Sequence, residues 1–335
     1  MVAMSETFGQ RLRRLRCAAG LSQSQLARLV PISQSSLSRS ESDTQAVDDQ
    51  AVAARLDELL GAAGTLRALA YPNAAELVLT DDDRERIARH LEHPSRIDGG
   101  TVTALGDLLA AQRRLDDVLG PEIIIPGSIS QMEILRGLLP HARGPHRAAL
   151  AEVVAEYVQF IGWLYAETRA DERAVALLGQ AEELADEAGS GELAAQAANF
   201  RGYVARQRGN ARGVVRWFLA EHHTPGAHVA QRVGAAAQAA HGYARLGERD
   251  EALRLMDVAG RLLDEAARLD PPRTAYWLTP TFHRLNFGLT HLALADHATA
   301  ADHFAAGFAG LPEDQQRAEW TAEYRLAWDA AREAR

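Results

Sequence analysis

The stretch LSQSQLARLVPISQSSLSRSE, residues 21–41, predicts two short helices joined by a tight turn. The first helix is expected over about 23–29, with Ser22 as its N-cap, because a serine hydroxyl can accept hydrogen bonds from the free backbone N–H groups of the first turn. Pro31 ends this helix, since proline has no N–H to donate and disfavours helical geometry at the preceding residue. The second helix is expected over about 34–40.

The two helices are expected to have distinct inward and outward faces. Leu26, Leu29 and Val30 close the inward side of the first helix, and Leu37 that of the second. Ser33 can cap the second helix. The outward side of the second helix carries polar side chains, which are Gln34, Ser35, Ser38 and Arg39.

This outward face suits the major groove of DNA. An α-helix fits that groove, where each base pair shows a distinct set of donors and acceptors. Glutamine can pair with adenine, and arginine with guanine, through two hydrogen bonds each. A helix-turn-helix places the N-terminal residues of its second helix at the bases. The stretch therefore predicts DNA binding, and the alternative is a polar helical hairpin that touches no DNA.

The stretch resembles the helix-turn-helix of the phage-repressor type, often called the xenobiotic-response-element (XRE) family. The likeness rests on Leu21-Ser22-Gln23, on Leu26-Ala27, on the run Ile32–Arg39 and on Glu41. Two features depart from the family: Ser40 stands where an apolar residue is usual, and the glycine that commonly follows the glutamate is missing.

The resemblance also implies which residues contact DNA. Gln23, at the start of the first helix, would bond a phosphate, and residues of the second helix would reach bases. Independently of the resemblance, some of the arginines on the preceding helix, Arg14 among them, are expected to touch phosphates, which strengthens binding without reading sequence; the alternative for the others is plain solvation. The predicted DNA-binding residues are Gln23, Gln34, Ser35, Ser36, Ser38, Arg39 and Arg14.

Further helices complete an N-terminal domain over residues 1–70. Residues 5–19 predict a first helix, because apolar residues recur there at helical spacing. Residues 48–60 predict a fourth helix, and a short fifth helix is expected over 63–69. The run Tyr71-Pro72-Asn73 then marks a boundary.

Charge is unevenly distributed along the 335 residues. All 36 basic residues are arginine, which together with abundant alanine indicates a GC-rich genome rather than nucleic-acid binding. Residues 1–40 hold six arginines and one acidic residue, a balance of +5, whereas the rest holds 30 arginines and 44 acidic residues, a balance of −14. A basic head on an acidic body is typical of a small DNA-binding domain joined to a body that does not bind DNA.

Cysteine usage and hydropathy indicate the compartment. The single cysteine, Cys17, rules out an intramolecular disulfide and fits a reducing cytoplasm. The first residues lack the apolar run of a signal peptide, and no stretch approaches the about 20 apolar residues of a membrane span. We therefore expect a cytoplasmic protein with no membrane partner.

The segment after the head has little repeated pattern. Residues 71–100 are interpreted as a linker, with a charged connecting helix at 81–93. An amphipathic helix is expected over 101–119. The run PEIIIPG, residues 121–127, is the only β-looking segment, and it is too short and isolated for a sheet, so Ile123–Ile125 are expected to enter a helical core.

From about residue 130 onward, helix follows helix and an internal repeat is visible. Small residues let paired helices approach, and aromatic residues fill the space between successive pairs. Such repeats bury their apolar faces only by stacking, which makes a curved solenoid. The clearest copy is 242–253, and 291–304 is an imperfect one. Glycine–aromatic pairs spaced 40 residues apart mark three copies: Gly162-Trp163, Gly202-Tyr203 and Gly242-Tyr243.

This part resembles the tetratricopeptide-like helical repeat over roughly residues 145–312, with a period near 40 instead of about 34. The sequence thus predicts an all-α protein. Its parts are a five-helix helix-turn-helix domain over 1–70, a linker with a connecting helix over 71–100, and an α-solenoid of tetratricopeptide-like helical hairpins over 101–335.

The sequence lacks the common catalytic motifs. It has no phosphate-binding glycine loop, no G-x-S-x-G nucleophile turn, no H-E-x-x-H and no zinc-finger spacing. The most metal-like cluster, Glu221-His222-His223 with His228, is interpreted as a polar turn after a helix. We expect no enzyme, no metal and no cofactor; an enzyme with a DNA-binding head is the least favoured alternative, and those histidines would then hold its metal.

A binding cavity is the expected use of the solenoid, because a curved array exposes its inner helices on the concave side. Asparagine can pair with a peptide backbone and arginine can hold a carboxylate. The predicted effector-binding residues are Asn199, Arg201, Arg206, Tyr243, His283 and Asn286. The aromatic residues expected nearby are Trp163, Tyr165, Trp217, Trp277 and Phe282. The alternative is that aromatic residues at the repeated position, Trp163, Tyr203 and Tyr243, pack between repeats.

A phage-repressor-type head on a tetratricopeptide-like body resembles the peptide-sensing cytoplasmic regulators of Gram-positive bacteria and the head-plus-repeat regulators of GC-rich filamentous bacteria. The resemblance implies a sequence-specific transcription regulator that binds a double-stranded DNA operator as a homodimer. The repeats would dimerise, sense a peptide or small-molecule effector, or do both. The alternative is a protein-interaction scaffold, in which the repeats bind a partner protein and the helix-turn-helix only anchors it to DNA.

Overall fold

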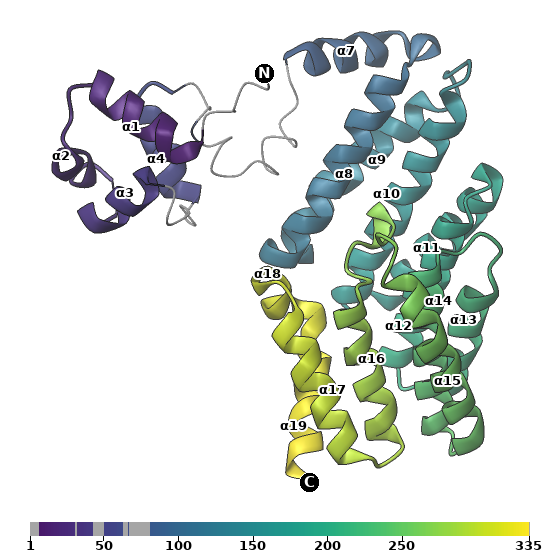
Figure 1. The fold of residues 1–335 in the computed structure, drawn as a ribbon. Coiled ribbons are helices and arrows are strands. Elements are labelled where there is room, and N and C mark those ends of the chain that lie inside the picture. The colour runs from purple at the N-terminus through teal and green to yellow at the C-terminus, as the bar shows by residue number, and fades with distance from the viewer. Residues whose placement is uncertain (1–6, 31, 43–49, 63–65, 67–80, 335) are drawn as a thin grey trace. The chain divides into compact units, whose positions relative to one another are not determined.

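The computed structural model describes residues 7–30, 32–42, 50–62, 66 and 81–334 (Figure 1). Every regular element in this described part is a helix, and the helices form two compact units, residues 1–80 and 81–335. In the second unit most consecutive helices pack against one another in a solenoid-like row. The predicted all-α class with an α-solenoid is therefore confirmed.

The first unit contains four described helices, α1 (Phe8–Ala18), α2 (Gln23–Ala27), α3 (Gln34–Glu41) and α4 (Gln50–Leu59). The predicted caps are present: the hydroxyl of Ser22 accepts from the backbone N–H of residue 25 at 3.2 Å, and that of Ser33 from the backbone N–H of residue 36 at 3.1 Å. Apolar side chains from all four helices form one core, with Leu12, Leu26, Leu37, Leu56 and Leu66 fully buried.

Some predictions for this unit need correction. The α2 helix ends at Ala27, and Leu29 is 49% exposed instead of closing the inward face. Ser40 is only 3% exposed, so a hydroxyl does occupy the core position where the XRE family usually has an apolar side chain. The predicted fifth helix, 63–69, lies outside the described residues except for Leu66.

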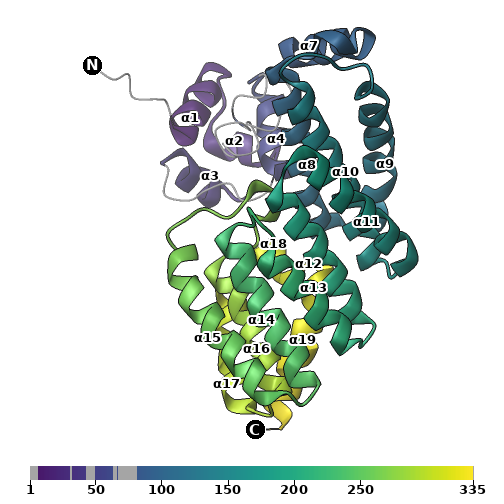
Figure 2. The ribbon, with the colours of Figure 1, turned by 90° about the vertical axis from the view of Figure 1, so that its right-hand side faces the viewer.

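The second unit begins with α7 (Asp81–Glu92), which packs against α8 (Gly99–Leu119). The connecting helix predicted inside the linker 71–100 therefore belongs to the body, and residues 71–80 lie outside the described part. The remaining long helices follow in order (Figures 1 and 2): α9 (Pro121–Leu138), α10 (Arg147–Glu167), α11 (Asp171–Ala188), α12 (Gly191–Gln207), α13 (Ala211–His223), α14 (Val229–Arg245), α15 (Arg249–Ala266), α16 (Pro280–Ala293) and α17 (His297–Gly310).

The PEIIIPG run is the start of α9. Pro121 stands at the first helical position, where its missing N–H costs nothing. Ile124 is 7% exposed and lies in the core, and Ile125 packs against that core while partly buried. Ile123 is 64% exposed, so the prediction that all three isoleucines enter the core is wrong for this one.

Three glycines let paired helices approach closely. Each lies opposite a side chain of the following helix, sixteen positions later: Gly162 opposite Leu178, Gly202 opposite Phe218 and Gly288 opposite Phe304. A methyl group added at these glycines would come within 2.7–2.9 Å of the opposing side chain, closer than real side chains pack. The predicted role of small residues is confirmed for these three hairpins.

The third copy of the repeat has a different register. At the turn of the other three hairpins, a residue with positive φ follows the glycine by seven positions; these are Arg169, Gly209 and Ala295. In the α14–α15 hairpin the positive φ belongs to Gly247, which places Ala240, not Gly242, at the equivalent position. Gly242 instead lies against Val214 and Val215 of the preceding helix α13. The spacing of 40 seen in the sequence is therefore not the structural period.

The C-terminal segment returns to the start of the body. A short helix α18 (Glu313–Arg317) contacts α8, and a single turn, η3 (Glu319–Thr321), leads into α19 (Ala322–Glu333). The α19 helix packs against α16 and α17. The segment between α15 and α16, which contains the turn η2 (Arg273–Ala275), also reaches α8, where Arg273 pairs with Asp107 at 2.6 Å. The row of helices thus has its two ends in contact.

Candidate functional site

The first candidate site is the outer face of α3. Gln34, Ser35 and Arg39 are exposed there, while Ser36 and Ser38 are half-buried. The hydroxyl of Ser36 accepts from the Arg39 guanidinium at 3.3 Å. These side chains lie on one short helix with polar tips at the surface, an arrangement that can meet the edges of bases in the major groove.

A buried ion pair fixes α3 in the first unit. Glu41, 8% exposed at the end of α3, accepts from the guanidinium of Arg16 on α1 through both oxygens, at 2.5 and 2.9 Å. The amide of Gln23 on α2 donates to the same carboxylate at 2.7 Å. Burial opposes the charge of Glu41, but the hydrogen bonds from Arg16 and Gln23 outweigh it, so the pKa of Glu41 is lowered.

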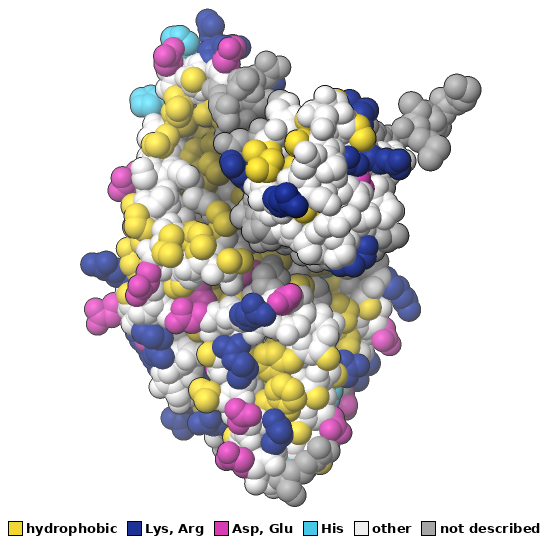
Figure 3. Space-filling view, turned by 90° about the vertical axis from the view of Figure 1, so that its left-hand side faces the viewer, with side chains coloured by type: hydrophobic (Ala, Val, Ile, Leu, Met, Phe, Trp, Pro, Cys, Tyr) yellow, Lys and Arg dark blue, Asp and Glu magenta, His cyan; other side chains and the backbone are white. Residues whose placement is uncertain are grey.

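This network changes the role of one predicted residue. The side-chain amide of Gln23 is engaged by Glu41, so in this state its N–H groups hold α2 to α3. The side chains of Arg13 and Arg14 on α1 and of Arg28, directly after α2, are exposed. On the face of this unit seen in Figure 3, arginine side chains predominate over acidic ones, which favours contact with phosphates.

The second candidate site is a pocket in the body, enclosing about 620 Å³ including its open mouth. Five long helices and two turn segments supply its walls. Nine of its fourteen lining residues are aromatic, although aromatic residues make up 6% of the chain. The lining residues are Arg113, Asp116, Asp117, Phe160, Trp163, Phe200, Tyr203, Arg206, Tyr276, Trp277, Phe282, Trp320, Glu323 and Tyr324.

The aromatic rings of the pocket contact one another. The ring of Trp163 lies 4.7 Å from that of Phe200 and 4.9 Å from that of Tyr203, between centroids. On the opposite side, Phe282 and Trp320 are 5.6 Å apart. Such ring pairs stabilise their arrangement beyond the apolar area that they bury, by about 0.5–1.5 kcal/mol each. The walls are therefore held in place by contacts between side chains from separate helices.

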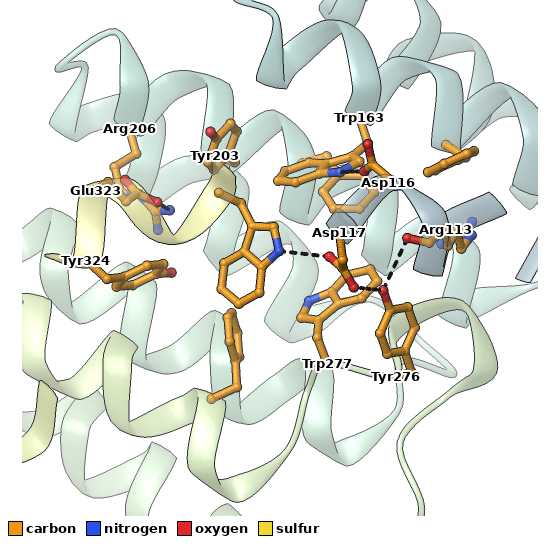
Figure 4. A pocket seen from close by; sticks show the side chains of 14 residues that line it. Arg113, Asp116, Asp117, Trp163, Tyr203, Arg206, Tyr276, Trp277, Glu323 and Tyr324 are labelled. Atoms are coloured by element: carbon orange, nitrogen blue, oxygen red, sulfur yellow. Dashed lines mark hydrogen bonds and ion pairs between the residues drawn. The ribbon is translucent and has the colours of Figure 1, made fainter. Parts of the chain in front are cut away.

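Polar groups cross the pocket between these rings (Figure 4). The indole N–H of Trp320 donates to Asp117 at 3.0 Å, and the Tyr276 hydroxyl donates to the same carboxylate. The indole N–H of Trp163 donates to Asp116 at 3.3 Å. Two neighbouring carboxylates of α8 therefore orient three aromatic side chains.

Both arginines of the pocket are paired with acids. Arg206 forms an ion pair with Glu323 of α19, and this pair outweighs the effect of burial, so the pKa of Arg206 is raised. Arg113 is 3% exposed and pairs with Glu156 at 3.4 Å. Burial is the largest influence on Arg113 and lowers its pKa.

The carboxyl groups of Asp116 and Glu167 lie together beside the pocket. Burial is the largest influence on both: it raises the pKa of Asp116 to about 7 and that of Glu167 well above its usual range. Each group also repels the charge of nearby acids, Asp117 and Glu319 among them. The pair therefore holds a proton into the neutral pH range.

Of the six predicted effector-binding residues, only Arg206 lines this pocket. Asn199 donates to Glu221 at 3.0 Å, inside the repeat. Arg201 pairs with Glu182 at 2.6 Å and lies 3.8 Å above the ring of Trp217. These contacts give Asn199 and Arg201 structural partners away from the pocket.

The other three lie in or against the packed interior. His283 is fully buried, and Asn286, 2% exposed, accepts from the hydroxyl of Tyr324 at 2.9 Å, directly behind a pocket residue. Tyr243 is partly buried against the cluster around Phe218. The structure thus does not bring the six residues into one site.

The sequence predicts only some of the pocket residues: Trp163, Trp277 and Phe282, expected near the effector-binding residues, do line the pocket. Most of the missed residues come from α8, from the segment before α16 and from the C-terminal segment, and the other two lie on α10 and α12. The one available signal was the concentration of aromatic and acidic residues in those regions. The missed set is Arg113, Asp116, Asp117, Phe160, Phe200, Tyr276, Trp320, Glu323 and Tyr324.

Two histidines of the cluster at the end of α13, His222 and His228, form hydrogen bonds with backbone groups of the following segment. Nδ1 of His222 contacts the backbone oxygen of Arg232 at 3.0 Å, and Nδ1 of His228 accepts from the backbone N–H of residue 230 at 3.2 Å. Within the described residues, no three His, Cys, Asp or Glu side chains are grouped as metal ligands.

The comparison with known proteins gives a match in the first unit. Residues 7–70 match the sequence model of a helix-turn-helix domain. This match covers α1 to α4 and includes the stretch 21–41. No curated protein matches the chain. In the part of the chain that the structure describes, no helix combines the length and the apolar character needed to cross a membrane.

Proposed function

We propose that this chain, whose residues 7–70 match a helix-turn-helix domain, is a sequence-specific DNA-binding transcription regulator with an effector-binding body. The observation that carries the proposal is the exposure of Gln34, Ser35 and Arg39 on α3, the second helix of the motif. The Arg16–Glu41 pair supports it, because it holds this helix against α1 and so fixes the direction in which those side chains point.

The effector role is supported by the pocket of the second unit. A pocket lined mainly by aromatic side chains with a few polar groups is typical of a small-molecule site. Because it draws on α8, α12 and α19, a ligand in it would contact helices from the beginning, the middle and the end of the body. Binding would act on DNA affinity if the ligand prefers one of two arrangements of the body.

Homodimer formation is also proposed. Two recognition helices about one DNA turn apart would read a two-fold symmetric operator. The exposed apolar side chains on α8 and α9 favour contact with a second copy, and hydrophobic side chains gather on the face of the body seen in Figure 3. The exposed apolar residues of these two helices are Leu115, Val118, Leu119, Ile123 and Ile134.

The test is selection from a random DNA library with the full-length protein. A two-fold symmetric motif is expected, and Arg39→Ala should lose discrimination at one position in each half-site, by about 1–3 kcal/mol, while retaining weak binding at low salt. Arg28→Ala is the matched control, since it removes an equal exposed charge directly after α2 and should weaken binding to all sequences alike.

A selection without an enriched motif, or an Arg39→Ala protein with the same motif and affinity, would reject base reading by α3. If binding were sequence-independent and the body instead formed a stoichiometric complex with another protein, the scaffold alternative would replace the regulator proposal.

A further inference from the structure

The pocket of the body contains more acidic than basic groups. Both of its arginines are occupied, Arg113 by Glu156 and Arg206 by Glu323. The guanidinium of Arg206 also lies 5.4 Å from the ring centroid of Tyr203 and 5.7 Å from that of Tyr324, where ring faces attract a cation. These arginines are therefore bound within the fold and leave other carboxyl groups without a cationic partner.

Asp116 and Glu167 are such groups. Asp116 lines the pocket and is 8% exposed. Its Oδ2 accepts from Trp163, and the buried Oδ1 of Asp116 and Oε2 of Glu167 have no N–H donor among the described residues, so the only hydrogen bond left to the two carboxyl groups is the one through the proton that they share. A cation beside this pair would favour release of the shared proton, because it would compensate the buried negative charge that is then left on the carboxyl groups.

The groups that face Asp116 come from three elements. On its own helix α8 they are Asp117 and Arg113; α10 contributes Trp163 and Glu167, and the turn η3 contributes Glu319. Acids outnumber bases in this set, and the one base is already paired with Glu156. The pocket thus offers negative potential next to aromatic ring faces.

We propose that this pocket binds an organic ammonium ion that carries an apolar body. The aromatic wall formed by Trp163, Phe200 and Tyr203 would lie against the cation, and the Asp116–Glu167 pair next to Trp163 would supply the counter-charge. A quaternary ammonium group donates no hydrogen bond, so it needs ring faces and negative potential and no direct contact with a carboxylate oxygen.

The far side of the pocket suits the apolar part of such a ligand. Phe282, Trp277 and Trp320 line that side, and the hydrogen bond from Trp320 to Asp117 holds one of its two indole rings. An anionic ligand would be repelled by Asp116, Asp117 and Glu319. A neutral apolar ligand would fill the space between the rings but would bring no positive charge to the buried carboxyl groups.

This inference names the class of ligand for the effector role proposed above. It rests on that role only where the ligand is called an effector. Binding itself can be measured without DNA. Three of the five tryptophans, Trp163, Trp277 and Trp320, line the pocket, so the intrinsic fluorescence of the full-length protein reports on its occupancy.

The experiment titrates the full-length protein with benzyltrimethylammonium, with choline and with 3,3-dimethylbutan-1-ol, the uncharged isostere of choline, and confirms stoichiometry by calorimetry. We expect saturable binding of one ammonium ion per chain, tighter for the benzyl compound, and affinity for the isostere about tenfold weaker than for choline. Asp116→Asn, which removes the charge and keeps the shape, should weaken both ammonium ions about tenfold. Asp186→Asn is the control, since this exposed acid on α11 does not line the pocket.

Absence of saturable binding of both ammonium ions up to about 10 mM would overturn the inference. Equal affinity for choline and its isostere would do so as well, as would unchanged affinity of a folded Asp116→Asn protein. DNA binding of the same preparations separates the two proposals. If an ammonium ion binds but leaves operator affinity unchanged, the pocket assignment stands and the effector role fails; if the operator is bound but no ammonium ion is, the pocket assignment alone fails.

Discussion

Trp320 donates its indole N–H to Asp117 at 3.0 Å, although 203 positions of sequence separate the two residues. Asp117 lies near the end of α8, and Trp320 lies in the turn that precedes α19. The hydrogen bond joins the first long helix of the body to its last segment. The aromatic pocket consequently exists only when both ends of the body are folded.

Replacing Trp320 with alanine should therefore destabilise the body and open the pocket. The partly buried indole packs against Phe282 at 5.6 Å and Tyr324 at 6.3 Å between ring centroids, and its truncation would remove these contacts and leave a void. We expect a loss of about 3 kcal/mol in the free energy of unfolding, measured by urea denaturation. Leu326→Ala, at a site 72% exposed on α19, should change the stability by less than about 0.5 kcal/mol. Equal effects of the two substitutions would show that the ends do not depend on this contact.

Gly202→Ala should destabilise the protein, because the added methyl group would lie 2.7 Å from the ring of Phe218 in the paired helix. The expected cost is about 1–3 kcal/mol from overpacking. Gly179→Ala is the matched control on α11, where a methyl group meets nothing within 4 Å. That substitution should instead stabilise the helix by about 0.5–1 kcal/mol. Thermal unfolding of both variants should shift in opposite directions; a shift in the same direction would contradict the close approach at Gly202.

The Asp116–Glu167 pair should make stability depend on pH in an unusual direction. The pKa of Asp116 is about 7 in the folded protein, above its ordinary value of 3.8, so the folded state keeps a proton that the unfolded chain has released. The retained proton therefore adds to the free energy of unfolding. This stabilisation is fully present below about pH 4 and is lost as the pH rises through about 7. We expect Asp116→Asn to be more stable than the wild-type protein at pH 8 by about 2 kcal/mol, with the difference vanishing at low pH.

Comparing the two proteins at each pH isolates this pair from other titrating groups. Buried histidines change the stability in the opposite direction. Burial lowers the pKa of His241 and of His283 to about 3, so their contribution to the free energy of unfolding is lost as the pH falls below about 6.5. These histidines are common to both proteins and cancel in the difference. A stability difference between variant and wild type that is constant from pH 5 to pH 8 would contradict the shared proton.

Glu41→Ala should loosen the helix-turn-helix without touching its exposed face. The substitution leaves the guanidinium of Arg16, 11% exposed, without its carboxylate, and it frees Gln23. We expect a loss of about 2–3 kcal/mol in the stability of the first unit, seen as faster hydrogen exchange of peptides from residues 7–42 in the full-length chain. Arg28→Ala serves as the exposed control. Unchanged exchange in Glu41→Ala would show that the ion pair does not fix α3.

The helix-turn-helix could be predicted from sequence because its signals are local. Ser22 and Ser33 cap helices that begin at the next residue, and Leu26 and Leu37 follow helical spacing. Glu41 is visible as a motif position, yet its partner Arg16 lies 25 residues earlier, on a helix whose arginines the sequence assigns only to phosphate or solvent. An ion pair between two helices leaves no spacing signal along the chain.

The pocket could be predicted only in part, for the same reason. Trp163 and Trp277 were expected near the concave face, but the α8 acids and Trp320 come from regions without the repeat pattern. The register of the third hairpin was wrong because Gly242 mimics the repeated glycine while packing against α13. The residue types show that a helix hairpin is present. They do not show on which side of the helix a glycine lies, because that depends on the position of the turn that follows.

The contact between the two ends of the body also bears on how it would respond to mechanical force. An open repeat array is nearly one-dimensional, and each repeat is held by its neighbours alone. Pulled from its termini, such an array would peel apart in a series of small steps. Here the Trp320–Asp117 hydrogen bond and the Arg273–Asp107 ion pair link α8 to segments far along the chain. The helices between them lie inside a closed loop of contacts, and tension on the chain reaches them only after this closure has broken.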